Sequence, residues 1–527
     1  MVLRYLFYLY AMGVIVIVFL LYLLWQPIIW AFVVLIPLIL IGVHDILQKR
    51  QNVLRNYPVW GHWRYILLSI RPMIQQYFIA SNQSDRPFNF EQRTLVYERA
   101  TQTLDTLPFG TQHDVRSIGY EWMVHSLSPK APNKTTSRIL IGNDQCKKPY
   151  LASRLNISAM SYGAISANAV RALNRGAKMG GFYQNTGEGG LSQYHLKEGG
   201  DLTWQIGTAC FGCRTPEGQF DPVQFQEKAQ HEQVKMIEVK LSQGAKPSHG
   251  GILPAAKITP EIAKIRGIPM GKDCISPPTN PAFSTPIGLM KYIEQLKALS
   301  GGKPIGFKLC IGQPKEFMGI CKAMLETGIL PDFITVDGAE GGTGAAPVEF
   351  SDYIGTPLNE GIILVHNCLK GINVRDKVRI IASGKIITGF DMAVKIALGA
   401  DLCHSARGMM FAVGCIQSLR CNQNTCPTGV ATQDKTRMYA LNVAEKAPRV
   451  HHFHDATVHS LLEVIGAAGL TSPDELEPKH IYRRINEAEV KHYNEIYPFL
   501  EAGQLLIGED LPSAYQSEWA VASAEAF

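Results

Sequence analysis

The stretch VRIIASGKIITGFDMAVKIAL, residues 378–398, contains one complete strand–loop–helix unit of this 527-residue chain. Residues 378–382 form a short apolar run that is typical of a buried strand, and residues 390–398 follow as a helical stretch. Between them lies a polar loop that contains glycine. A strand that is apolar on both faces belongs in a parallel sheet covered by helices. This unit therefore predicts a parallel α/β fold.

The same alternation of apolar runs and helical stretches continues on both sides of this unit. Further runs occur at residues 155–159, 236–241, 304–309, 333–336 and 402–406, and helical stretches at residues 166–178, 286–299 and 314–327. A domain of this size favours closure into a (β/α)8 TIM barrel, which we place at residues 151–440. An open doubly wound sheet is the alternative. We expect residues 49–150 to form a helical and irregular region packed on the barrel, and residues 441–527 a helical tail.

The N-terminal segment, residues 5–44, contains no Asp, Glu, Lys or Arg. A membrane-spanning helix needs about 20 apolar residues. We therefore expect two spans, at residues 5–25 and 28–43, in a transmembrane hairpin that occupies residues 1–48. Two alternatives stay open: a re-entrant second segment, because Pro37 interrupts it, and a pair of buried core helices in a soluble protein.

Basic residues flank this hairpin at both ends, with Arg4 before the first span and Lys49 and Arg50 after the second. Positive charge marks the cytoplasmic side of membrane spans, so we expect both termini and the catalytic domain in the cytoplasm. Residues 61–80 are amphipathic and either lie on the bilayer surface or pack on the barrel.

The composition excludes some functions and favours others. A formal net charge of +6 without a dense run of Lys and Arg gives little support for nucleic-acid binding. The chain has 11 cysteines, an odd number, which predicts free thiols in a reducing compartment, with metal binding as one use for them.

Four glycine-containing motifs lie at the ends of candidate strands: ISAMSYGAIS (157–166), NTGEGG (185–190), IEVKLSQGAKP (237–247) and VDGAEGGTGAAP (336–347). Barrel enzymes place their active sites at the carboxyl ends of the strands. From these motifs we take as candidate cofactor-binding residues Ala159, Met160, Ser161, Asn185, Glu188, Gly341 and Gly342.

Two later motifs, ASGKIITG (382–389) and SARGMM (405–410), are typical of a phosphate site. Barrels hold a phosphomonoester with the loops after strands seven and eight and with a helix N-terminus. Backbone N–H groups at glycine approach the phosphate closely, while basic side chains supply charge; a surface ion pair is the alternative for those basic residues. The candidates are Ser383, Gly384, Lys385, Ala406, Arg407 and Gly408.

Three cysteines occur close together in the segment Cys415-IQSLR-Cys421-NQNT-Cys426-Pro427. Compact spacing of this kind lets one loop wrap an iron–sulfur cluster. Three ligands without an obvious fourth favour a [3Fe–4S] over a [4Fe–4S] centre. Zinc and three inert buried thiols are the alternatives. A separate pair, Cys210 and Cys213, is either redox-active or structural.

Together these motifs resemble the FMN-binding synthase domain of glutamate synthase, and more closely its stand-alone, membrane-anchored relatives, over residues 105–435. The matching pieces are AMSYGAIS, NTGEGG, IEVK with QGAKP, CISPP, GFKL, EGGTGAAP, SGK with TG, and GCIQSLRCNQNTCPTGVATQ. The resemblance implies that the barrel binds FMN and that the three clustered cysteines ligate a [3Fe–4S] centre. It also implies that Lys308 lies at the flavin N1/O2 edge, where a cation stabilises the charge of reduction. Glu238 is implied as a proton handler on the substrate side, with a structural carboxylate as the alternative.

The family reaction implied by the resemblance forms 2-iminoglutarate from 2-oxoglutarate and ammonia and reduces it to glutamate. The electron donor would be a ferredoxin, a quinone or a separate reductase, because no dinucleotide-binding motif follows a strand. The chain departs from the family at residue 2, a valine where the glutaminase nucleophile would be, so glutamine hydrolysis is not expected. It also departs at His249 in QGAKPSHGG and Asn280 in ISPPTNPAFST.

Those two departures keep other functions open. An FMN-dependent 2-hydroxy-acid dehydrogenase, or a related quinone-linked enzyme, would need a base beside the flavin, for which His249 is the candidate. The third hypothesis is a membrane redox subunit that has no enzymatic turnover of its own.

Overall fold

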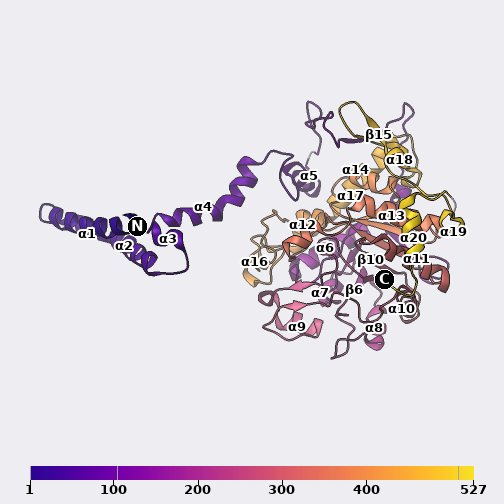
Figure 1. The fold of residues 1–527 in the computed structure, drawn as a ribbon, viewed down its shortest axis with the longest axis horizontal. Coiled ribbons are helices and arrows are strands. Elements are labelled where there is room, and N and C mark those ends of the chain that lie inside the picture. The colour runs from indigo at the N-terminus through magenta and orange to yellow at the C-terminus, as the bar shows by residue number, and fades with distance from the viewer. Residues whose placement is uncertain (1, 104, 509) are drawn as a thin grey trace. The chain divides into compact units, whose positions relative to one another are not determined.

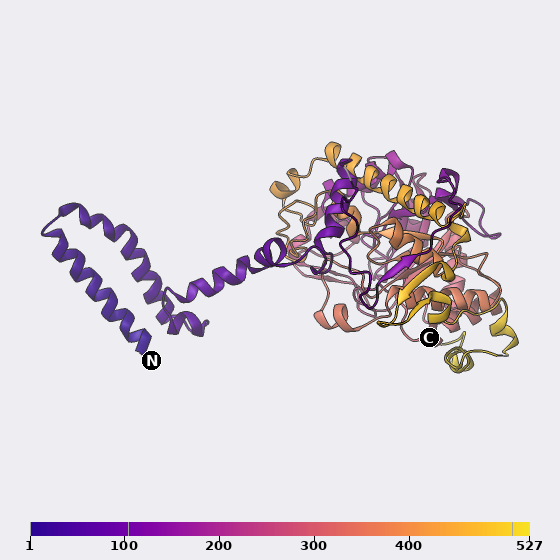
Figure 2. The same ribbon diagram turned by 90° about the horizontal axis from the view of Figure 1, so that it is seen from above.

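The computed structural model describes residues 2–103, 105–508 and 510–527. The chain forms two compact units, Met1–Glu91 and Gln92–Phe527. Figures 1 and 2 show both units, whose relative placement is not determined.

The first unit contains a helical hairpin. Helix α1 (Val2–Tyr22) turns into the 3-10 helix η1 (Gln26–Ala31), which continues as α2 (Phe32–Leu47), and the two long helices run antiparallel (Figure 2). A side chain on Gly42 of α2 would collide with the ring of Phe7, so glycine permits this close packing of the two helices.

The hairpin helices are exposed rather than buried. Two windows, Tyr5–Tyr22 and Gln26–Leu47, are long and apolar enough to cross a membrane, and only 11% and 6% of them is buried. Within the described residues, these two helices are therefore not buried core helices. Pro37 lies inside α2 without ending it. Helices α3 (Asn52–Asn56) and α4 (Gly61–Ile74) follow, and α4 continues as the π-helical turn η2 (Gln75–Ile79).

The second unit is built on eight parallel strands that form a closed barrel, with the last strand paired to the first. This confirms the predicted TIM barrel, and the open doubly wound sheet is wrong. The strands are β4 (Leu155–Ile157), β5 (Tyr183–Asn185), β6 (Asp201–Ile206), β7 (Val234–Lys240), β10 (Ile305–Leu309), β11 (Phe333–Asp337), β12 (Arg379–Ser383) and β13 (Leu402–Ser405).

Helices surround these strands on the outside (Figure 1). Of those expected from the sequence, α10 and α11 have the predicted bounds, and α6 and α14 differ from theirs by one or two residues. The helices are α6 (Ala167–Gly180), α8 (Pro222–Ala229), α10 (Pro286–Leu299), α11 (Pro314–Thr327), α13 (Leu358–Gly371), α14 (Gly389–Ala397) and α15 (Arg407–Ala412). The long helix α17 (Val443–Ala467) packs on α6, where a Cβ on Gly176 would lie 2.6 Å from Cβ of Val450.

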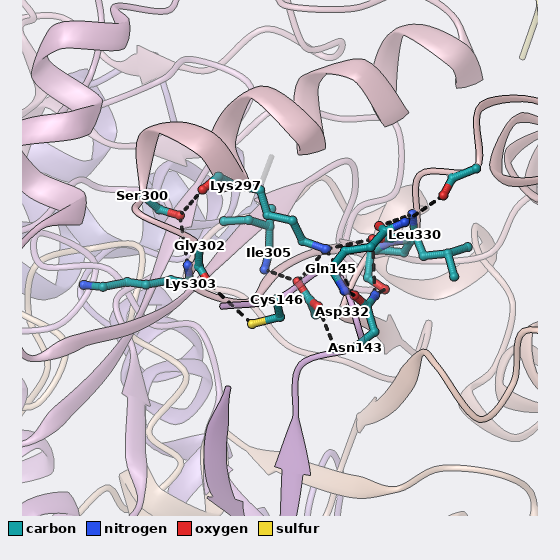
Figure 3. A network of polar contacts seen from close by, with 12 residues as sticks. Asn143, Gln145, Cys146, Lys297, Ser300, Gly302, Lys303, Ile305, Leu330 and Asp332 are labelled. Atoms are coloured by element: carbon teal, nitrogen blue, oxygen red, sulfur yellow. Dashed lines mark hydrogen bonds and ion pairs between the residues drawn. The ribbon is translucent and has the colours of Figure 1, made fainter. Parts of the chain in front are cut away.

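The amino end of the barrel is closed by a hairpin of two antiparallel strands, β2 (Arg138–Ile141) and β3 (Tyr150–Ser153). Ile139 and Ala152 of this hairpin pack in one buried cluster with barrel residues that include Phe333. The hairpin is fastened by Asp332, whose carboxylate accepts from the backbone N–H of Asn143 at 3.0 Å and pairs with Lys297 at 3.1 Å (Figure 3). The opposite, carboxyl end is therefore the one left for a site.

The C-terminal region was predicted to be helical, but it also contains two strands. Strands β14 (Ile481–Arg484) and β15 (Val490–His492) form an antiparallel sheet with β1 (Glu121–Met123). The rings of Trp122 and Tyr482 stack at 5.7 Å, a long-range contact that local periodicity does not reveal.

The remaining elements are short. They are α5 (Phe90–Thr101), α7 (Gln193–Leu196), β8 (Ile252–Leu253), α9 (Pro260–Arg266), β9 (Cys274–Ile275), α12 (Val348–Tyr353), α16 (Lys435–Tyr439), α18 (Tyr493–Ile496), α19 (Gln504–Ile507) and α20 (Ser513–Val521).

Candidate functional site at the carboxyl end of the barrel

The glycine-rich motifs converge at the carboxyl ends of the strands. A Cβ on Gly187, after β5, would lie 2.6 Å from the backbone nitrogen of Ser161, after β4. A Cβ on Gly342, after β11, would lie 2.9 Å from Cζ of Arg407, after β13. The loops that follow four different strands therefore pack backbone to backbone or backbone to side chain, which glycine alone permits at these positions.

Glu238 of β7 is the centre of a buried hydrogen-bond network inside the barrel. Its side chain is fully buried, and Oε1 accepts from Asn185 Nδ2 at 2.8 Å and from Gln205 Nε2 at 2.6 Å. The other oxygen, Oε2, accepts from the Thr335 hydroxyl at 2.6 Å. Because three donors from β5, β6 and β11 bind one carboxylate, Glu238 connects β7 to three other strands across the barrel interior. Gln205 and Thr335 were not identified from the sequence.

A cluster of charged side chains lies beside this network. Glu188 accepts from Lys240 Nζ at 2.9 Å. Burial raises the pKa of the Glu188 carboxyl, but Lys240 and Arg266 outweigh it, and the pKa is lowered overall. Arg266 donates to the hydroxyl of Ser161 at 3.3 Å, so α9 contributes to the same cluster.

Lys246 adds a further cation to this cluster. Its side chain is buried, and it donates to the carbonyl of Ala345 at 2.8 Å. Burial and the charge of Lys240 lower the pKa of Lys246 to about 8. Lys240 and Lys246 lie within the motif IEVKLSQGAKP, so their positions were visible in the sequence, although their roles were not assigned.

Lys308 of β10 lies on the inner face of the same end. It is 5% exposed, and its Nζ is 3.9 Å from Oδ2 of Asp337, the last residue of β11. The same Asp337 oxygen accepts from the backbone N–H of Gly244 at 2.9 Å. Lys308 is therefore held inside the barrel rather than in a surface ion pair.

The candidate phosphate residues also lie together. The hydroxyls of Ser158 and Ser383 are 3.3 Å apart, so side chains at the ends of β4 and β12 meet across the intervening strand β13. Gly384 and Lys385 both have positive φ, +157° and +49°, so the loop turns sharply there. Arg407 donates to the carbonyl of Glu340 at 2.8 Å, and burial lowers its pKa to about 10. The alternative of a surface ion pair does not fit Arg407.

The three cysteines of the predicted iron–sulfur loop are all free thiols, Cys426 buried and Cys415 and Cys421 half-buried. Burial raises the pKa of Cys415 to about 12, with smaller contributions from Cys421 and Cys426, so the three sulfurs lie close enough to influence one another. Within the described ranges, no group of three or more His, Cys, Asp or Glu side chains is arranged around a single metal ion.

This cysteine loop is fastened to the first glycine motif. Lys257 Nζ donates to the carbonyl of Cys421 at 3.2 Å and to that of Ala164 at 2.5 Å. Gln433 donates to the carbonyls of Gly163 and Ile165 at 3.1 and 3.0 Å. The loop therefore lies directly behind the segment expected to contact a flavin.

The other residues singled out in the sequence have local contacts. Cys210 and Cys213 are fully buried and burial raises the pKa of both thiols, which favours the structural alternative. His249 Nδ1 is 2.9 Å from the carbonyl of Gly250, and its ring meets Phe350 edge to face. Asn280 accepts from the backbone N–H of Ala282 at 3.0 Å.

A closed parallel barrel whose carboxyl end gathers buried lysine and arginine beside glycine-rich loops is the arrangement of a barrel-class enzyme with a positively charged site. The particular family follows from comparison with known proteins. The chain belongs to the glutamate synthase family, because the family model described as the conserved region in glutamate synthase matches residues 117–471. It is accordingly a glutamate synthase-type oxidoreductase, which acts on CH–NH₂ donors.

Two curated relatives illustrate the similarity. The glutamate synthase large subunit-like protein YerD of Bacillus subtilis (strain 168) is 36% identical over 513 residues, 89% of this chain and 97% of that protein. The archaeal glutamate synthase [NADPH] of Methanocaldococcus jannaschii is 33% identical over 345 residues, 65% of this chain and 64% of that protein. Among solved structures, a variant of mandelate oxidase overlaps 76% of this chain and 92% of its own, at 15% identity and a TM-score of 0.41. That overlap is too weak to bear on function.

Proposed function

We propose that the barrel binds FMN and reduces 2-iminoglutarate, formed from 2-oxoglutarate and ammonia, to glutamate. The observation that supports this most directly is a set of cations at the carboxyl end of a barrel of the glutamate synthase family. Lys240, Lys246 and Lys308 are buried, and Arg407 is half-buried. FMN, when bound, supplies the hydride chemistry.

The cofactor would be held from both ends. The phosphate suits the loop of Ser383, Gly384 and Lys385 and the start of α15 at Arg407 and Gly408, because a glycine turn, a helix N-terminus and basic residues occur together there. Gly384 has φ +157°, and a Cβ at this position would lie 3.2 Å from Cδ2 of Leu358, so the tight turn favours glycine. The ring suits the first motif, Ala159 to Ser161, and the loop of Gly341 and Gly342.

Lys308 supplies a fixed cation for the ring. It is buried at 5% exposure and 3.9 Å from Asp337, so it is oriented before any ligand binds. A fixed ammonium at a place where negative charge develops stabilises that charge without reorganisation.

The substrate carboxylates would be bound by the remaining cations. Lys240, Lys246 and Arg266 come from three successive segments and surround Glu188, which stays ionised because its pKa is lowered. An anionic oxo acid matches this surplus of positive charge.

Glu238 fits a positioning role better than proton transfer. Its two oxygens already accept from three donors, which leaves Asn185 oriented toward the loop that contains Glu188. Asn185 Oδ1 in turn accepts from the backbone N–H of Gly187 at 3.0 Å. We therefore propose that Glu238 holds this loop in place.

We propose a [3Fe–4S] cluster on Cys415, Cys421 and Cys426. Burial raises the pKa of Cys426, but hydrogen bonds from the hydroxyl and amide of Thr428 and from the amides of Val430 and Ala431 outweigh burial, and the pKa is lowered overall. Hydrogen bonds of this kind stabilise a thiolate ligand. The cluster would pass electrons from an external donor, a ferredoxin, a quinone or a reductase subunit.

The hairpin of α1 and α2 would anchor the enzyme in the bilayer as two spans, with the barrel in the cytoplasm. Its support is the exposure of long apolar helices and the basic residues on both flanks. Deletion of residues 1–85 should move the protein from the membrane fraction to the soluble fraction with its barrel intact. Retention of the shortened protein in the membrane would contradict this anchor.

The reaction is tested by anaerobic titration of the purified, chemically reduced protein with 2-oxoglutarate and ammonium, followed by flavin absorbance and glutamate analysis. Reoxidation that needs both compounds and yields glutamate supports the proposal. Turnover of a 2-hydroxy acid would favour the dehydrogenase, and a reducible flavin without either turnover would favour the redox subunit.

A further inference from the structure

Outside the barrel, the first unit contains an apolar pocket at the end of α2 that the proposed reaction does not use. Its volume is about 530 Å³, and it is formed by the last turns of α2, the turn before α4 and the first turns of α4. The lining residues are Leu38, Leu40, Ile41, His44, Val59, His62, Trp63 and Ile66. A pocket of this size suits a ring-containing small molecule.

The imidazoles of His44 and His62 and the indole N–H of Trp63 are the polar side-chain groups of an otherwise apolar lining. His62 is held by Asp45, with Nε2 2.9 Å from Oδ2 and 3.0 Å from Oδ1. Asp45 is fully buried, and it also accepts from the backbone N–H of Val59 at 2.9 Å. His44 on the same helix lies 3.7 Å from the Asp45 carboxylate.

This arrangement determines what the pocket can recognise. A buried carboxylate is costly unless it is paired, so Asp45 keeps the Nε2–H of His62 pointed at itself. The remaining nitrogen of His62, Nδ1, is then a lone-pair acceptor when the ring is neutral and a donor when it is protonated. One side chain can thus bind either a hydroxyl or a carbonyl of a ligand whose body is apolar.

The position of the pocket restricts the ligand further. It lies at the end of the second candidate span, Gln26–Leu47, whose surface is almost entirely exposed. Trp60 and Trp63 beside it are 75% and 57% exposed, as expected of aromatic residues at a bilayer interface. A ligand that enters here comes from the lipid phase and has a compact polar ring at the interface.

We propose that this pocket binds the head group of a membrane quinone or quinol, with His62 and His44 as its hydrogen-bonding partners. A quinol hydroxyl donates to Nδ1 of neutral His62, and a quinone carbonyl accepts from the protonated ring. The inference depends on the membrane location given in the proposed function. It chooses the quinone class among the external donors named there, with the quinol as the form that gives up two electrons and two protons and becomes the quinone.

The test uses the full-length protein in phospholipid nanodiscs and a photoreactive azidoquinone, with labelled peptides identified by mass spectrometry. Label is expected in the segments that contain His44 and His62, and an excess of a decyl benzoquinone should remove it. Ile41→Phe, which fills the pocket, and His62→Gln, which removes the imidazole held by Asp45, should each reduce labelling about tenfold.

Two matched controls separate the pocket from general partition into lipid. Val34→Phe adds the same ring on α2 at a residue that is 63% exposed and does not line the pocket. His113→Gln makes the same change at an exposed histidine of the other unit. Both should leave labelling unchanged, and circular dichroism and flavin content show which variants are folded.

Uniform labelling along both apolar helices, or unchanged labelling in Ile41→Phe and His62→Gln, would overturn the proposal. A phospholipid that native mass spectrometry finds in the pocket and that excess quinone does not displace would overturn it as well. Chemically reduced protein does not need the pocket to form glutamate. Glutamate formation therefore tests the proposed function, and quinone labelling tests the pocket.

Discussion

Replacement of Glu238 by glutamine and by alanine distinguishes positioning from proton transfer. In Glu238→Ala, the donors of Asn185, Gln205 and Thr335 lose their acceptor in a fully buried place. Each orphaned donor costs about 1–3 kcal/mol, so the three together cost roughly 3–9 kcal/mol before any cavity is counted. That is comparable with the whole stability of many domains, about 5–15 kcal/mol.

Glutamine preserves most of the network. Its amide oxygen can accept from Asn185 and Gln205, and its N–H₂ group can donate to the Thr335 hydroxyl, which also accepts. The loss of folding free energy is then limited to the difference between hydrogen bonds to a charged carboxylate and hydrogen bonds to a neutral amide, about 1–2 kcal/mol in total. We expect Glu238→Gln to fold, to bind flavin and to retain turnover within about tenfold.

Thermal melting by circular dichroism, flavin content and the pH profile of glutamate formation measure these effects. Glu227→Ala, a change at an exposed carboxylate of α8, is the control for loss of a Glu side chain. If Glu238→Gln has the melting temperature of the wild type but its turnover falls at least a hundredfold, Glu238 transfers a proton and the positioning argument is refuted.

Three further predictions concern the cluster and the substrate site. Cys421→Ala should abolish the paramagnetic signal of an oxidised [3Fe–4S] centre while flavin stays bound, and Cys213→Ala should leave that signal intact. If Cys213→Ala abolishes the signal and Cys421→Ala does not, Cys421 is not a cluster ligand. Lys257→Met takes a cation away from the Cys421 carbonyl and should lower the cluster potential by roughly 60 mV, whereas Lys257→Arg should not, as read by redox titration. Lys246 loses its proton near pH 8 because its pKa is lowered to about 8, so affinity for an anionic oxo acid should fall as the pH rises through 8. Lys246→Arg should remove that inflection from KM, and an unchanged profile would show that Lys246 does not bind the substrate.

Several features of this protein are determined by neighbouring residues and could therefore be predicted from the sequence. Helices α10 and α11 have the predicted bounds because a proline begins each one and the apolar spacing continues to the end. The hairpin was readable for the same reason, since a long uncharged stretch needs no partner to be recognised. No apolar run was assigned to β5, although the motif NTGEGG marked its end, or to β6, which carries the polar residues Asp201, Thr203 and Gln205.

The site was readable only in part. The glycine motifs marked the carboxyl end of the barrel, and the spacing of Cys415, Cys421 and Cys426 marked the loop for which we propose an iron–sulfur cluster. Which side chains meet there was decided by barrel closure, which brings Glu238 to Asn185 across 53 positions of the chain. The contact of Lys257 with the cysteine loop spans 164 positions.

Local sequence patterns record what each segment prefers, because helix and strand periodicity act over a few neighbouring residues. The charged cluster at the barrel mouth and the histidine pocket at the end of α2 depend instead on distances between segments. Those distances are set by the packing of whole elements, and only the tertiary structure contains them.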